Sequence, residues 1–68
     1  MKARITLKNF PDKSVDNLIL IKKFNPKLGS ISEITDFTSF FVSSDSFVFI
    51  GDIVFAIHGD EIVSVEFN

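Results

Sequence analysis

The sequence holds few side chains of the kinds that catalyse reactions. It has one histidine, His58, and no cysteine, so the nucleophile-and-base pairs of common hydrolases lack a component. No serine lies in a Gly-X-Ser-X-Gly motif. The three glycines, at positions 29, 51 and 59, are too far apart for a phosphate-binding loop. We therefore expect a protein that is not an enzyme and that carries no cofactor.

Three aspartates, Asp45, Asp52 and Asp60, fall in expected loops, where such residues usually serve turn geometry. Asp52 and Asp60 would lie at opposite ends of one strand, so they could not bind the same ion, and we expect no metal site. His58 would lie opposite Glu61 across a two-residue turn. This placement favours an exposed polar pair over a pH-sensitive contact at an interface.

Length and charge narrow the class of protein. The 68 residues predict one small domain, 1–68, and the formal net charge of −2 argues against nucleic-acid binding, which depends on basic surface. No apolar run approaches the ~20 residues that span a membrane. The segment Met1 to Lys8 alternates charged and apolar residues, unlike a signal peptide, so we expect a cytoplasmic protein. Nine residues are Phe, and self-association or a partner would help so short a chain to cover them.

The last third of the chain predicts the framework that positions these residues. Three β-rich runs between Phe47 and Phe67 are separated by Gly51-Asp52 and Gly59-Asp60. Glycine at the first position of a two-residue loop is typical of a type II′ hairpin turn, because that position needs a positive φ. We therefore expect a three-stranded antiparallel meander. The alternation of apolar and polar residues from Ala3 to Asn9 predicts a further, half-buried strand.

The segment from Ser30 to Val42 predicts a helix. Ser30 and Glu33 match a capping box, in which the side chain of each residue accepts a hydrogen bond from the backbone N–H of the other. Apolar residues then recur at steps of three and four, at Ile31, Ile34, Phe37 and Phe41. This spacing places them on one side of a helix, whereas a strand would put Ile31 and Ile34 on opposite faces.

The segment from Ser14 to Asn25 suits either a helix or a strand. Ser14 could cap a helix, lysines fall in its last turn, and Asn25-Pro26 would end it. The apolar run from Leu18 to Ile21 would suit a buried strand equally well. The agreement of the start, charge and stop signals favours the helix. The predicted fold is therefore α+β, in the order β-α-α-β-β-β, with a four-stranded antiparallel sheet and two helices on one face.

The two expected turns divide the meander between two faces of the sheet. One face, which includes Phe47, Phe49 and Val54, would form the helix-covered core, extended by the first strand if that strand pairs with the last. The other face is left as an uncovered apolar patch of Val48, Ile50, Ile53, Phe55, Ile57 and Ile62. Such a patch usually marks an interface. The alternative is that the strand register or the number of helices differs from this prediction, in which case these six residues belong to the core. We expect a non-catalytic interaction, accessory or regulatory protein that uses the patch for homodimerisation or for binding a protein partner.

Residues Ile57 to Val65 resemble the second motif of Sm-like RNA-binding barrels, in which an apolar residue, Arg, Gly and two variable residues precede an apolar strand. His58 stands at the arginine position, and no Asp-X-X-X-Asn segment matches the first motif of that family. The resemblance implies a five-stranded barrel that binds RNA, with which the expected mid-chain helix conflicts. A small RNA-binding β-domain is thus the alternative function.

Overall fold

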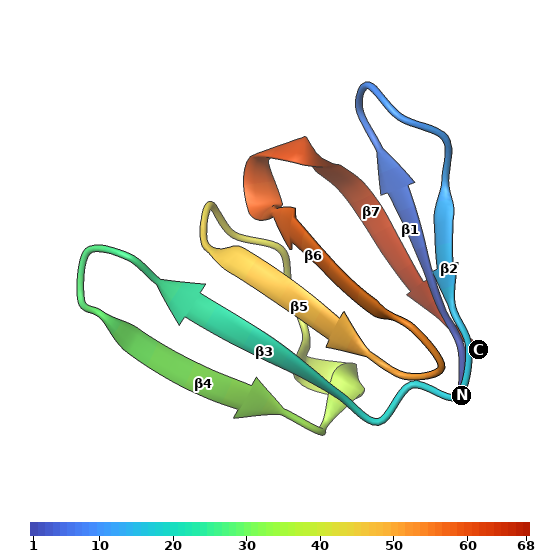
Figure 1. Cartoon of the computed structure of the whole chain (residues 1–68), viewed down its shortest axis with the longest axis horizontal. Coiled ribbons are helices and arrows are strands. Elements are labelled where there is room, and N and C mark those ends of the chain that lie inside the picture. The colour runs from blue at the N-terminus through green and yellow to red at the C-terminus, as the bar shows by residue number, and fades with distance from the viewer.

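The computed structural model describes residues 1–68 and consists of short β-strands with two 3-10 helices and no α-helix (Figure 1). The strands are β1 (Ala3–Leu7), β2 (Lys13–Val15), β3 (Leu20–Asn25), β4 (Ser30–Ile34), β5 (Ser46–Ile50), β6 (Val54–His58) and β7 (Ile62–Phe67). The 3-10 helices are η1 (Phe37–Ser39) and η2 (Gly59–Glu61). The expected α+β fold, with two helices on one face of a four-stranded sheet, is therefore wrong. The structure contains no helix with the length and apolar character needed to cross a membrane.

The strands form two antiparallel sheets, in the orders β2-β1-β7 and β4-β3-β5-β6 (Figure 1). Both sheets contribute to one core of buried apolar residues: Ala3, Ile5, Leu7, Val15, Leu18, Ile21, Phe47, Phe49 and Ile62. The sheets therefore pack face to face, and each sheet covers the inner apolar face of the other, where helices were expected from the sequence.

The first strand is the part of the prediction that the structure confirms most fully. β1 buries Ala3, Ile5 and Leu7 and turns its alternate residues outward. It pairs with β7, as expected if the first strand lies beside the last, and Arg4 is directly opposite Glu66. Period-two alternation is a reliable signal here because one face of β1 is core and the other is wet.

The segment from Ser14 to Asn25 contains the end of β2 and the whole of β3, so the helix prediction is wrong. Asn17, with a φ of 51°, separates β2 from β3, a left-handed conformation that asparagine tolerates. β3 then lies inside its sheet, where Ile21 pairs with Ile34 on one side and Phe49 on the other. The Asn25-Pro26 stop signal belongs to a hairpin turn instead, because the Asn25 side chain accepts hydrogen bonds from the N–H groups of the turn.

The helix predicted for Ile31 to Val42 is also wrong. Its first part is β4, the edge strand beside β3, in which Ile31 is exposed. The capping role belongs to Asp36, which accepts hydrogen bonds from the N–H (3.1 Å) and hydroxyl (2.6 Å) of Thr38 at the start of η1. The spacing of the aromatic residues brings two of them onto the core, because η1 stacks Phe37 on Phe67 and the following Phe40 packs edge-on against Phe49.

The two Gly-Asp pairs are not type II′ turns. Gly29, with a φ of 66°, is the only glycine in the left-handed region. Gly51 and Gly59 instead lie where the backbone of another segment passes close by: an added Cβ at Gly51 would meet the Asp16 carbonyl, and at Gly59 the Ser43 carbonyl. The expected meander therefore ends after β6, since η2 carries the chain into the other sheet, where β7 pairs with β1.

Candidate functional site

The β5–β6 hairpin sets the surface of the four-stranded sheet. Ile50 pairs with Val54, and Phe49 pairs with Phe55, whereas the sequence analysis placed Ile50 opposite Ile53. The loop thus holds one residue more than a two-residue turn. A shift of one residue moves every β6 side chain to the other face of the sheet.

The true outer face of the sheet is largely apolar and has no layer over it. Its apolar members, which we call the outer face, are Leu20, Phe24, Ile31, Val48, Ile50, Val54 and Ala56, as the strand register places them. Phe24 is 39% exposed, Ile31 66% and Val54 68%. The cross-strand neighbours Lys22 and Glu33 bring one cation and one anion to the same face. An uncovered apolar sheet face on a small domain is typical of an interaction surface.

The six residues predicted as an interface do not share one face. Val48 and Ile50 lie on the outer face as expected. Phe55 and Ile57 point inward and pack, half-buried, against the core, and Ile62 is itself a core residue of β7. Ile53 is exposed in the β5–β6 loop. The signal that could have corrected this grouping is size, because Phe55 and Ile57 are the bulky members of β6 and Ala56 is the small one.

A second surface lies at the side of the sandwich. A cleft of about 410 Å³ is lined by Leu7, Phe10, Pro11, Asp12, Lys13, Phe55 and Ile57. The Lys13 Nζ lies 5.7 Å from the ring centroid of Phe55. Asp12 is neutralised by Arg4, whose guanidinium nitrogen is 3.2 Å from the carboxylate. From the sequence, the segment from Phe10 to Lys13 is only a turn that ends the first strand, because it contains Pro11-Asp12.

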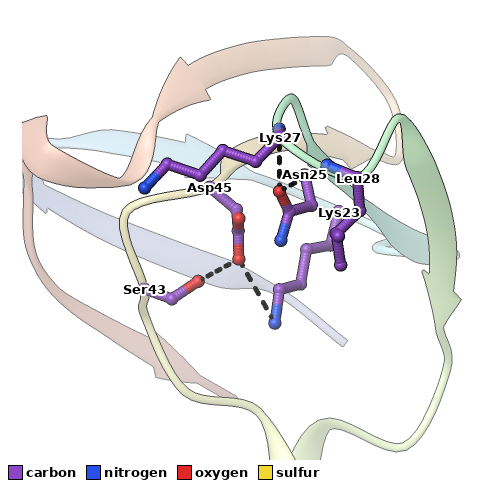
Figure 2. Close-up of polar contacts among 6 residues, drawn as sticks. All are labelled: Lys23, Asn25, Lys27, Leu28, Ser43 and Asp45. Atoms are coloured by element: carbon purple, nitrogen blue, oxygen red, sulfur yellow. Dashed lines mark hydrogen bonds and ion pairs between the residues drawn. The ribbon is translucent and has the colours of Figure 1, made fainter.

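The carboxylate of Asp45, in the loop before β5, contacts polar groups of its own loop and of β3 (Figure 2). It accepts a hydrogen bond of 2.6 Å from the Ser43 hydroxyl and lies 3.4 Å from the Lys23 Nζ on β3. The Ser43 hydrogen bond, and to a lesser degree Lys23, hold the pKa of Asp45 below its usual value of 3.8. A carboxylate so stabilised is a weak base, and it is the hydrogen-bond acceptor of the Ser43 hydroxyl, so it does not activate Ser43 as a nucleophile. The group instead ties the loop to β3.

His58 does not pair with Glu61 as predicted. Its Nδ1 accepts a hydrogen bond of 3.3 Å from the Asp60 N–H, within η2, and lies 3.5 Å from the Asp60 carboxylate. The Glu61 carboxylate instead accepts a bond of 3.5 Å from the Asn9 side chain. His58 thus caps a turn.

No cluster of three or more potential metal-binding side chains is present. The fold and the two apolar surfaces define a small β-sandwich with an uncovered sheet face. No family model, curated protein or solved structure matches this chain. The stretch from Ile57 to Val65 that resembles the Sm-like motif covers the end of β6, all of η2 and the first part of β7, and the mid-chain helix that conflicted with the resemblance is absent.

Proposed function

We propose that this chain is a non-catalytic interaction protein that forms a homodimer through the outer face. The observation that supports this proposal is an apolar face left uncovered on a domain that already has a core. That core takes its side chains from the inner faces of both sheets and from Leu18. The members of the outer face lie outside that core and are half-buried or exposed. Covering them in a dimer removes apolar surface from water, which stabilises the dimer by about 25 cal/mol per Å².

The charges on the outer face suit a second copy of the chain. Lys22 and Glu33 lie side by side across β3 and β4. In a two-fold dimer each patch meets its own copy, so Lys22 of one protomer can lie against Glu33 of the other. A face with a single sign of charge would repel its copy, and this face carries both signs.

The size of the outer face predicts a weak dimer. Four strands at about 4.8 Å spacing and five residues at about 3.4 Å rise give a flat area of about 19 by 17 Å. Stable complexes commonly bury about 800 Å² on each partner. The exposed Leu28, at the turn between β3 and β4, would extend the contact. We therefore expect a dimer whose population depends on concentration.

Two valine-to-aspartate variants test the proposal. Val54 lies on the outer face and is 68% exposed, and Val63 lies on the other sheet and is 59% exposed. Both variants should fold, because each carboxylate lies in water in the free chain. Val54→Asp should weaken the dimer at least about tenfold, since the charge is desolvated in the dimer without a partner. Sedimentation equilibrium measures the affinity, and circular dichroism reports folding.

Two results would overturn the proposal. The first is a wild-type chain that stays monomeric up to about 1 mM, which would mean an association free energy weaker than about −4 kcal/mol. The second is a Val63→Asp variant that dissociates as readily as Val54→Asp, which would place the contact elsewhere. A dimer that responds only to Val54→Asp supports the outer face.

The RNA-binding alternative gains less support. Two of the seven basic residues are already ion-paired, Arg4 with Asp12 and Lys23 with Asp45. The formal net charge is −2, and phosphate binding requires a cationic surface. Retention of the chain on single-stranded RNA that falls steeply with salt would favour this alternative over the homodimer.

A further inference from the structure

The two flanks of the β-sandwich differ in how they are closed. On one flank the segment between β4 and β5 covers the gap between the sheets. Phe40 from this segment packs edge-on against both Phe47 of one sheet and Phe67 of the other, with ring centroids 5.5 Å apart in each case. On the other flank, no segment of the chain plays that part between β2 and β6. The cleft of about 410 Å³ lies there, between the inward side chains of β6 and the β1–β2 hairpin.

Two strand edges lie beside this cleft. β6 ends the four-stranded sheet and pairs only with β5, and β2 ends the three-stranded sheet and pairs only with β1. Alternate backbone N–H and C=O groups of β6 therefore lack a strand partner. The edges are joined at one end, where the Asp52 N–H donates to the Asp16 carbonyl at 2.9 Å and the Asn17 side chain donates to the Asp52 carboxylate at 3.0 Å. These hydrogen bonds fix the end of β2 relative to the β5–β6 loop, and their residues do not line the cleft.

The cleft has a defined charge. Of its two charged residues, Asp12 is neutralised by Arg4 at 3.2 Å, whereas Lys13 forms no ion pair. Lys13 lies opposite Ile5 and so faces inward, and its ammonium lies 5.7 Å from the Phe55 ring centroid. An apolar cleft with one unpaired cation over an aromatic ring complements a bulky apolar group that carries a nearby carboxylate.

We propose that the cleft binds an extended peptide of a partner protein, which pairs with the free edge of β6 and inserts an apolar side chain beside an acidic one. The β6 edge supplies backbone hydrogen bonds, and the cleft selects the side chains that point into it. Because side chains two residues apart in a strand share a face, the motif is an apolar residue and an acidic residue at positions i and i+2. The site uses the inner face of β6 and is independent of the proposed homodimer, which uses its outer face.

The test uses a blocked pentapeptide with phenylalanine at its second position, glutamate at its fourth and threonine elsewhere. Two control peptides differ by one feature each: lysine in place of glutamate, and N-methylation of alternate backbone amides. 3-Phenylpropionate serves as a small carboxylate that cannot pair as a strand. Titration of the whole chain to about 1 mM of each probe is followed by chemical shifts of the β6 amides and of Phe55 and Ile57.

The expected result is binding of the glutamate peptide with shifts at β6 and in the cleft. The lysine and N-methylated peptides should bind at least about tenfold more weakly, which corresponds to about 1.4 kcal/mol. Lys13→Glu should reverse the preference between the glutamate and lysine peptides. The matched Lys27→Glu variant, whose lysine lies in the exposed turn after β3, should change the affinity less than about twofold.

Three results would overturn the proposal. One is the absence of shifts in the cleft with the glutamate peptide up to about 1 mM. Another is equal binding of the N-methylated peptide or of 3-phenylpropionate, which would indicate a site for small carboxylates with no strand pairing. The third is an equal loss of affinity in Lys13→Glu and Lys27→Glu, which would show attraction to overall charge and not to the cleft.

Discussion

Replacing Gly59 with alanine should destabilise the domain far more than replacing Gly29. An alanine Cβ at position 59 would lie 2.9 Å from the Asp45 carbonyl oxygen and closer still to that of Ser43. Both obstacles are backbone atoms, which cannot swing aside as the end of a side chain can. At Gly29 an added Cβ has open space around it, and only the φ of 66° opposes the substitution.

The expected cost follows from the contacts of Gly59. Ordinary contact begins at 3.4 Å, so residue 59 must retreat from the Asp45 oxygen by at least 0.5 Å, the difference between 3.4 and 2.9 Å, and further from Ser43. The retreat disrupts the hydrogen bond of 2.8 Å from the Gly59 N–H to that same oxygen. An unsatisfied buried group costs about 1–3 kcal/mol, and overpacking adds about 1–3 kcal/mol. A 68-residue chain has a total stability of about 3–10 kcal/mol.

Urea unfolding followed by circular dichroism measures these costs. Gly59→Ala should lose several kcal/mol or fail to fold, whereas Gly29→Ala should lose about 1–2 kcal/mol, the cost of a left-handed alanine. Equal losses of unfolding free energy in the two variants would refute the close backbone contact between η2 and the loop before β5. The glycine would then serve only turn conformation, as the sequence analysis expected.

Three further predictions follow from burial and charge. Phe49→Ala should cost about 3–5 kcal/mol of unfolding free energy and Phe24→Ala much less, because Phe49 is fully buried and Phe24 is 39% exposed; equal losses in urea unfolding would contradict the strand register. The pKa of Asp45 is depressed below 3.8, so its carboxylate stabilises the fold above that pH and the contribution disappears as the pH falls through the lower, folded-state value. The stability of Asp45→Asn should therefore vary less than that of the wild type between about pH 5 and pH 2, and an unchanged profile by thermal unfolding would contradict this role. His58→Ala should lose less than about 1 kcal/mol, since the residue caps an exposed turn, and a loss above ~2 kcal/mol would indicate a buried network.

The strands were predictable where one face is core and the other is wet. Ala3, Ile5 and Leu7 alternate with polar residues, and the pattern alone predicts both the strand and its buried side. The runs that became β5, β6 and β7 were also predicted as strands from their β-branched and aromatic residues. These signals are local, because the period of two is a property of the strand itself.

The helices were predicted from signals that strands and turns can share. Ser30 and Glu33 have the spacing of a capping box, yet in β4 they have no capping role. Ile21 belongs to a run that is apolar all round, and such a run suits the interior of a helix layer or of a sheet. Only its position between Ile34 and Phe49, which are far from it in the sequence, makes it a strand residue.

Which β6 side chains face outward depended on one extra residue in the β5–β6 loop. The sequence identified an uncovered apolar face of the sheet, and the structure has one, but Ile53 lies in the loop, so that Val54 and Ala56 face outward while Phe55 and Ile57 face inward. The cleft could not be predicted, because it brings Phe10 to Lys13 against β6 across more than forty residues of chain.

The sequence by itself determined that the segments of β1, β5, β6 and β7 are extended, that the first strand is half-buried, and that apolar residues exceed what the core can hold. The tertiary structure decided the register of β6, the entry of β7 into a separate sheet, and the role of the two Gly-Asp pairs. Gly51 and Gly59 make room for the carbonyl groups of Asp16 and Ser43. A close approach of two backbones is a property of both segments together, so the residues around either glycine carry no sign of it.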